Sequence, residues 1–155
     1  MRDDPMRLSA MEWSRESFTV SCDPQKVDRK TVAAFLASSY WAQGIPRSTV
    51  EKSIDGSLCF SLLESDQLIG FARVISDRAT IAYLGDVFVQ PEFRGRGLGK
   101  WLVQCVMSHP ELKGLRRWIL VTRDAHDLYA PLGFRPLAHA DRYMELVNPD
   151  VYNGT

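Results

Sequence analysis

A run of glycines and basic side chains near the middle of the chain has the composition of a phosphate-binding loop. Glycine has no Cβ, so a ligand can approach the main chain closely, and the first N–H groups of a following helix have no partner within that helix. Such a helix end attracts anions, and several nearby cations favour a ligand with more than one phosphate. The members of this predicted phosphate site are Arg94, Gly95, Arg96, Gly97, Gly99 and Lys100.

The spacing of the glycines separates this loop from two nucleotide-binding motifs. A mononucleotide P-loop places Ser or Thr after its Gly-Lys pair, whereas Trp101 follows Lys100 here. A dinucleotide fingerprint has a third glycine where Lys100 stands and an acidic residue about 20 positions later, where this chain has Arg116 and Arg117. An ordinary tight turn remains as the alternative, but such a turn does not require glycines and cations together. We therefore favour phosphate binding by a different motif.

The loop connects a predicted strand to a predicted amphipathic helix. The apolar run of residues 80–89 ends before Pro91, and its density predicts a strand buried on both faces. After the loop, apolar side chains recur at helical spacing. These are Leu98, Trp101, Leu102, Cys105 and Val106.

Two motifs in this chain resemble those of the GNAT family (Gcn5-related N-acetyltransferases). Arg94-x-x-Gly97-x-Gly99, directly after a strand, is similar to the family's acetyl-CoA-binding motif. Residues 125–134 resemble the later segment A-x-x-L-Y-x-x-x-G-F. The resemblance covers about residues 17–147. It implies an α/β (α+β) fold with a mixed, mostly antiparallel central sheet and helices on both faces, and direct acetyl transfer from acetyl-CoA to a primary amine.

The resemblance also assigns roles to single residues. In the family the pyrophosphate lies on main-chain amides of the glycine loop, and the pantetheine arm pairs with the end of the preceding strand, here Phe88 and Val89. Tyr129 stands where the family has a phenol that donates to the leaving sulfur. A phenol with a pKa of about 10 stays protonated at pH 7 and can donate. A tyrosine that only packs in the core is the alternative.

For the remaining site residues, two alternatives are open in each case. Many family members have an Asn that contacts pantetheine where this chain has Asp124, but we favour an N-cap of the next helix for this residue. For the general base we favour Asp86 over Asp77, because Asp86 interrupts an apolar run. Tyr40 and Trp41 follow the first helix, where the family commonly forms part of the acceptor pocket, and they either line that pocket or merely pack.

The composition predicts one domain in a reducing compartment. The chain has 155 residues, with 19 basic and 19 acidic side chains, so no overall field attracts nucleic acid or an anionic membrane. Cys22, Cys59 and Cys105 stand in apolar surroundings and predict core thiols, with no metal site. No signal peptide or membrane span is expected, which favours the cytoplasm.

Hydrophobic periodicity and turn signals predict the other elements. We expect strands at 18–22, 58–64, 68–76, 118–122 and 142–147, and helices at 27–39, 47–54 and 125–130. No element is assigned to residues 1–16, an end that can fray. The acceptor is a small-molecule or protein amine, and the resemblance also implies a homodimer. A non-catalytic acyl-CoA-binding or sensing module of the same fold is the alternative function.

Overall fold

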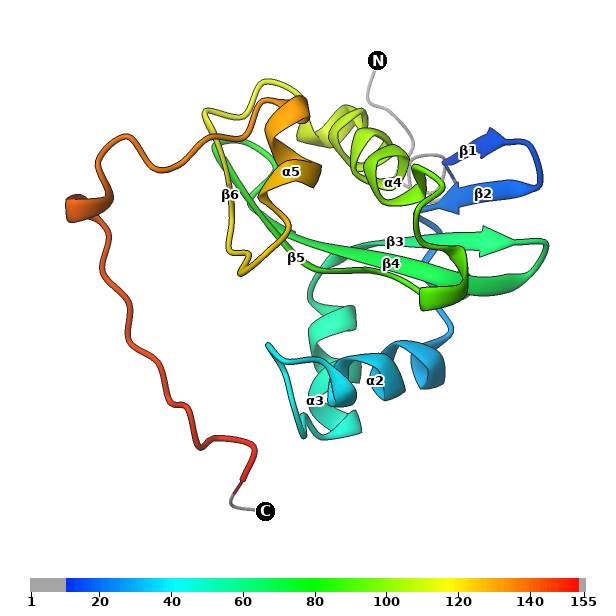
Figure 1. Cartoon of the computed structure of the whole chain (residues 1–155), viewed down its shortest axis with the longest axis horizontal. Helices are drawn as coiled ribbons and strands as arrows, with labels where there is room; N and C mark the ends of the chain where they lie inside the picture. Colours follow the sequence, from blue (N-terminus) through cyan, green and yellow to red (C-terminus); the bar gives the residue numbers. More distant parts are fainter. Residues whose placement is uncertain (1–10, 154–155) are drawn as a thin grey trace.

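The computed structural model of the chain describes residues 11–153, and its central element is one six-stranded sheet (Figure 1). Neighbouring strands are antiparallel, except that the last two are parallel. The mixed, mostly antiparallel sheet predicted from the sequence is therefore confirmed. The strands lie in chain order: β1 (Glu12–Arg15), β2 (Phe18–Ser21), β3 (Leu58–Glu64), β4 (Gln67–Ser76), β5 (Ile81–Val89) and β6 (Arg117–Leu120).

Helices cover both faces of the sheet and enclose two apolar cores (Figure 1). One core holds α2 (Arg29–Ser38) and α3 (Arg47–Asp55) against one face. The other holds α4 (Leu98–Met107) and the short α5 (His126–Tyr129) against the opposite face. Each predicted helix is present, and the end residues differ by a few positions at most.

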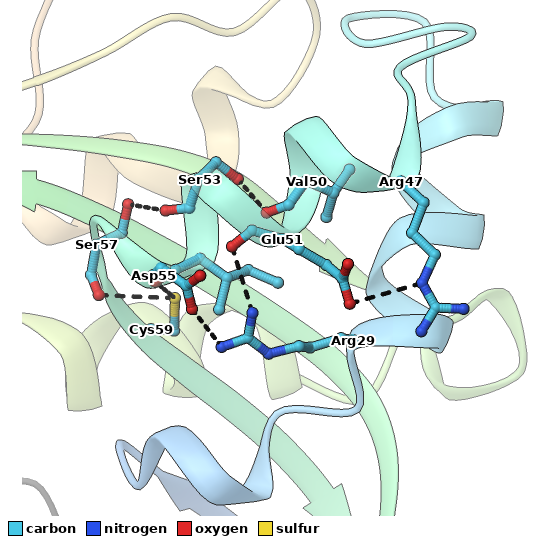
Figure 2. Close-up of polar contacts among 9 residues, drawn as sticks. Arg29, Arg47, Val50, Glu51, Ser53, Asp55, Ser57 and Cys59 are labelled. Carbon is cyan, nitrogen blue, oxygen red and sulfur yellow. Dashed lines mark hydrogen bonds and ion pairs between the residues drawn. The ribbon is translucent and has the colours of Figure 1, made fainter.

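Side-chain contacts hold α3 against α2. The Arg29 guanidinium of α2 lies 2.6 Å from the Asp55 carboxylate and donates to the carbonyl of Glu51 at 3.3 Å (Figure 2). Arg47 pairs with the Glu51 side chain within α3 at 3.7 Å. The two helices therefore form one unit, and the loop between them carries Tyr40 and Trp41.

The sheet opens between β5 and β6. Their parallel ladder ends where Leu84 faces Leu120, whereas β5 stays paired with β4 as far as Val89. Residues 85–89 of β5 therefore have no neighbouring strand on the β6 side within the described chain. We call this opening the β5–β6 gap. It leaves main-chain groups of β5 available to a ligand.

A β-bulge at Asp86 lies at the entrance to this gap. The β4–β5 register shifts between Phe71 and Arg73, and Asp86 has a left-handed φ of 53°. Asp adopts this conformation more readily than most residues. A bulge redirects a side chain, and here it brings the carboxylate to Arg73 of β4.

The structure corrects three expectations for the strands. Residues 12–15, left unassigned, form β1 on the edge of the sheet, while residues 1–10 lie outside the described part. Strand β5 is not buried on both faces, because Ile81 and Tyr83 are exposed. β6, for which the apolar residues at 118–121 predict a buried strand, is only half-buried. α2 and α3 thus leave the Ile81–Tyr83 end of the sheet uncovered.

The predicted closing strand at 142–147 is also wrong. This segment forms no strand in the structure and runs away from the sheet (Figure 1). A short 3₁₀ turn at Ala140–Arg142 precedes it. Over residues 11–153, no helix combines the length and the apolar character needed to cross a membrane.

Candidate active site

A cavity of about 760 Å³ extends from the glycine loop to Tyr129. The β5–β6 gap forms one of its walls, through Val87, Phe88 and Val89. The Phe88 ring is buried and stacks on Phe35 with 3.8 Å between ring centroids, so this residue offers mainly its backbone to a ligand. The strand end that was predicted to bind a ligand, Phe88 and Val89, therefore lies in the wall of this cavity.

The glycine loop has the conformation that only glycine adopts easily. Gly95 and Gly97 both have φ of 77°, and no atom lies within 4 Å of the position of a Cβ at either residue. Gly97 precedes the first residue of α4, so N–H groups of that helix end face the loop. A Cβ on Gly99 would make only ordinary contacts, 3.7 Å from Leu128 and 3.8 Å from Val89. The open space at the loop is therefore beside Gly95 and Gly97, whose left-handed backbone leaves the position of a Cβ empty.

Two of the three predicted cations of the loop line the cavity, Arg94 and Lys100. Arg94 also donates from Nε to the carbonyl of Val89 at 2.9 Å, which connects the loop to the end of β5. The guanidinium of Arg96 lies 5.1 Å from the Phe18 ring instead, and its side chain is not part of the lining. Fewer cations of the loop therefore line the cavity than the sequence predicted.

A second cavity, of about 430 Å³, adjoins the first and contains Asp86. The two Asp86 oxygens accept hydrogen bonds from Trp41 Nε1 at 2.9 Å and from Arg73 Nε at 2.8 Å. Arg73 in turn donates to Ser57 Oγ at 3.0 Å. The side chains of Asp86 and Arg73 are 12% and 17% exposed, so this ion pair is largely removed from water. The hydrogen bond from Trp41 to Asp86 therefore holds the indole ring at the bulge.

Aromatic side chains form the outer wall of the second cavity. Tyr40, Trp41 and Tyr83 all line it. The guanidinium of Arg123 lies 3.7 Å from the centroid of the Tyr40 ring, and the Arg123 N–H donates to the Tyr40 hydroxyl. Tyr40 and Trp41 thus line the cavity rather than merely packing.

Tyr129 lines both cavities at the point where they meet. Its side chain is 8% exposed, and this burial raises its pKa to about 12, with a smaller contribution from Tyr40. The phenol is therefore neutral across the physiological pH range and can donate a hydrogen bond.

The structure does not bring Asp77 to the site. Its oxygens accept from the N–H groups of Ala79, Thr80 and Ile81 and from the Thr80 hydroxyl, within the turn before β5. These hydrogen bonds, with that from the Thr80 hydroxyl first, hold the pKa of Asp77 well below its usual value. Asp77 stabilises a turn and is not available as a base.

The expected cap by Asp124 is wrong. The residue before α5 is Ala125, whose N–H donates to Thr122 Oγ1 at 2.9 Å. The Asp124 carboxylate instead lies 3.5 Å from the Arg123 guanidinium, is 65% exposed, and lines both cavities. The alternative, contact with a ligand, is the one that its position permits.

Sequence reasoning missed Arg73 and Arg123. Arg73 carried a signal, because it is a lone charge in the apolar run of β4 and such a charge needs a partner. Arg123 carried none, since its contact with Tyr40 joins positions that lie far apart in the chain.

Comparisons with known proteins agree with this geometry. The model of the acetyltransferase (GNAT) family matches residues 9–134. A Gibberella zeae protein assigned to the acetyltransferases is 30% identical over 140 residues, covering 76% of this chain and 78% of that protein. A ycf52-like N-acetyltransferase of Prochlorococcus marinus is 32% identical over 113 residues, with 69% and 62% covered.

Solved structures share the fold. A GNAT-family protein from Xanthomonas campestris pv. campestris has a TM-score of 0.84 and 48% identity, covering 87% of this chain and 96% of that chain. A Clostridium acetobutylicum structure with acetyl-CoA has a TM-score of 0.61 and 15% identity, covering 84% and 94%. The latter likeness shows the fold alone. With its glycine loop, its sheet and its family match taken together, this chain belongs to the GNAT acetyltransferase family.

Proposed function

We propose that the protein transfers an acetyl group from acetyl-CoA to a primary amine. One observation carries the proposal: the cavity of the glycine loop and the cavity of Asp86 meet at Tyr129. Two substrates that enter from the two sides would have their reacting groups beside one buried phenol. Bringing reactants together in this way is a major source of rate acceleration.

The residues of the first cavity fit acetyl-CoA. The open space at Gly95 and Gly97, the α4 N-terminus and the cations Arg94 and Lys100 suit a pyrophosphate. The backbone of residues 85–89 suits an extended amide-containing arm, which would pair there like a strand. When bound, acetyl-CoA supplies the activated acetyl thioester.

Tyr129 is assigned to the leaving sulfur as a hydrogen-bond donor. With a pKa of about 12, the phenol is a weaker acid than an ordinary thiol with a pKa of about 8.5. Complete proton transfer to a thiolate would be uphill by about 5 kcal/mol. Tyr129 therefore stabilises the developing negative charge by donation, and the thiol takes its final proton from another donor.

Asp86 is assigned to the incoming amine. Each oxygen of a carboxylate has two lone-pair sites, and each Asp86 oxygen uses one for Trp41 or Arg73. A remaining site can accept from an ammonium group and receive its proton. The rings of Trp41 and Tyr83 favour a cation at the same place, whereas the Tyr40 ring already carries the Arg123 guanidinium.

Buried thiols support a cytoplasmic location for this reaction. Cys59 and Cys105 are buried and form no disulfide, an arrangement that suits a reducing compartment. Burial raises the pKa values of both thiols to about 12, so neither is a reactive thiolate.

Titration calorimetry of acetyl-CoA into the protein, followed by a thiol-release assay with a panel of amines, tests the proposal. Gly99→Glu would place a carboxylate in the lining of the first cavity, so we expect it to weaken acetyl-CoA binding at least about 100-fold. Gly56→Glu is the matched control, because a Cβ there also makes only ordinary contacts, the nearest at 3.7 Å, and lies away from both cavities.

The same experiment separates the enzyme from a non-catalytic acyl-CoA sensor. A sensor would bind acetyl-CoA, and Gly99→Glu would weaken that binding. With every amine tested, however, it would release no thiol above the background of hydrolysis. Equal binding by Gly99→Glu and Gly56→Glu would contradict the assignment of the loop itself.

A further inference from the structure

Three exposed apolar side chains lie next to one another on the sheet face that α2 and α3 cover only in part. Ile75, Ile81 and Tyr83 are 48%, 40% and 36% exposed. Ile75 of β4 lies directly opposite Tyr83 of β5, and Ile81 is two residues from Tyr83 on the same face. The core under α2 and α3 includes Phe71 and Phe88 but none of these three. We call the three residues the β4–β5 strip. Adjoining exposed apolar side chains are typical of a surface that a ligand or partner covers.

The β4–β5 strip begins inside the cavity that contains Asp86. Tyr83 lines this cavity. Gly85 lies between Tyr83 and Asp86 in β5, and a Cβ on Gly85 would lie 3.0 Å from Cε1 of Tyr83. The Tyr83 ring therefore leans over Gly85 in the direction of Asp86. Because Gly85 has no side chain, the ring can lie there, and one apolar surface continues from the cavity to Ile81.

The charges at the two ends of this surface differ. At the cavity end, the Asp86 oxygens keep lone-pair sites for an ammonium group. At the other end, the β5–β6 register places Arg117 opposite Ile81. The Asp77 carboxylate, in the turn before β5, accepts four hydrogen bonds within that turn. An ammonium group is therefore favoured at Asp86, and a second one is disfavoured on the strip.

We propose that the acceptor is a small primary amine whose nitrogen is attached to an apolar chain. The inference rests on the proposed function, because it places the ammonium group of that reaction at Asp86. The chain would cross the Tyr83 ring and lie along Ile75 and Ile81, where burial of its methylene groups contributes binding energy. Three side chains can cover a chain of several carbons, whereas a stable protein interface uses about 20 residues on each side.

The test is steady-state thiol release from acetyl-CoA with propylamine, hexylamine, hexamethylenediamine and a lysine-containing peptide. Full burial of one methylene would raise kcat/KM about fourfold, and a strip covers only one side of the chain, so we expect about twofold for each methylene. Hexylamine should therefore exceed propylamine about eightfold. Hexamethylenediamine has the same chain but a second ammonium group, and its kcat/KM should be at least about tenfold below that of hexylamine.

The double variant Ile75→Thr and Ile81→Thr tests the strip itself. Threonine keeps the branched Cβ that strands favour, and both positions are exposed, so the variant should fold. The ratio of kcat/KM for hexylamine to that for propylamine should fall from about eightfold to about twofold or less. Val151→Thr, at an exposed apolar residue outside the strip, is the matched control and should keep the ratio of the unaltered protein.

Four results would overturn the inference. Thiol release that does not depend on chain length, or that is fastest with the diamine, would exclude an apolar chain and leave acetyl transfer standing. An unchanged ratio in the double variant would place the chain on another surface. A peptide that exceeds hexylamine would assign the strip to a polypeptide acceptor. Binding of acetyl-CoA without thiol release from any amine would refute the proposed function, and this inference with it.

Discussion

Tyr129 and Asp86 face the same cavity from different chemical environments. Burial raises the pKa of Tyr129, so the phenol keeps its proton. Asp86 accepts hydrogen bonds from Arg73 and Trp41, and each of its oxygens keeps a lone-pair site for a further donor. One side chain therefore donates and the other accepts, which is the division of roles that amine acetylation requires.

Replacing Tyr129 with Phe removes one hydroxyl and leaves the ring that packs in the core. We expect kcat to fall about 100-fold with little change in KM, since the lost hydrogen bond forms mainly as the sulfur leaves. Steady-state thiol release measures both constants. A large rise in KM with unchanged kcat would instead assign Tyr129 to ground-state binding.

Replacing Asp86 with Asn removes the charge but retains a side chain that tolerates the left-handed backbone. If Asp86 receives the amine proton, kcat/KM falls at least about 100-fold and the acid limb of the pH profile changes.

Trp41→Phe is the matched comparison for Asp86→Asn. It removes the indole donor to Asp86 and leaves the carboxylate and Arg73. We expect a smaller loss with an unchanged pH profile. Equal losses in both variants, with identical profiles, would make Asp86 a positioning residue that acts through Trp41.

The role of a single residue could be predicted from the sequence where a charged side chain interrupts an apolar run. Asp86 stood out because a carboxylate interrupts an apolar run, and the same reasoning applied to β4 would have found Arg73. The bulge that joins them has no local signal, because register is a property of two strands together. Asp124 was misassigned because Thr122, two residues earlier, provides the hydroxyl at the start of α5.

At the scale of elements, the α2–α3 pair carries the Tyr40–Trp41 loop, so its rigidity matters for the shape of the cavity that contains Asp86. Arg29 joins the two helices through two contacts, whereas Arg47 makes a contact within α3 only. The two arginines therefore form a natural pair for comparison.

We expect Arg29→Ala to lower the free energy of unfolding by about 1 kcal/mol, because it removes a partly exposed ion pair and a hydrogen bond to a helix carbonyl. Arg47→Ala should change it by less than about 0.5 kcal/mol. Urea denaturation measures both. Equal effects would mean that the contact between the helices contributes no more than a surface pair.

Elements with a strong internal period were predicted correctly, and elements that depend on a partner were not. The helices and the β3–β4 hairpin follow from spacing and turn residues. β1 is only four residues long, too short for its period to be recognised in the sequence, and pairing with β2 holds it in the sheet. Residues 142–147 are rich in apolar side chains, but a strand also needs a partner, and this segment pairs with no strand of the described chain.

At the scale of the whole molecule, several buried groups must lose protons when the protein unfolds at alkaline pH. Burial raises the pKa values of Cys59 and Cys105 from 9.0 to about 12, and that of Tyr129 from 10.0 to about 12. Each folded value lies above the unfolded value. The associated stability is therefore complete below pH 9 and is lost as the pH rises towards 12.

We expect the free energy of unfolding to fall between pH 9 and 12, by up to about 1.4 kcal/mol per pH unit for each of these groups. The double variant Cys59→Ala and Cys105→Ala should be less stable at every pH but should show a shallower slope. Chemical denaturation under reducing conditions gives the slope. An unchanged slope would show that the thiols do not contribute.

On the proposed function, the β5–β6 gap would also link the lifetime of the protein to the supply of acetyl-CoA. A bound acyl-CoA arm would complete the sheet, and mass action would stabilise the fold by about 2.7 kcal/mol at 100 times the dissociation constant. We expect thermolysin to degrade the protein more slowly in acetyl-CoA, with the benefit lost in Gly99→Glu. Equal degradation rates with and without acetyl-CoA would show that the lifetime of the protein does not depend on acetyl-CoA. If acetyl-CoA is the co-substrate, the protein would be degraded sooner in a starved cell, and its abundance would follow the acetyl-CoA concentration.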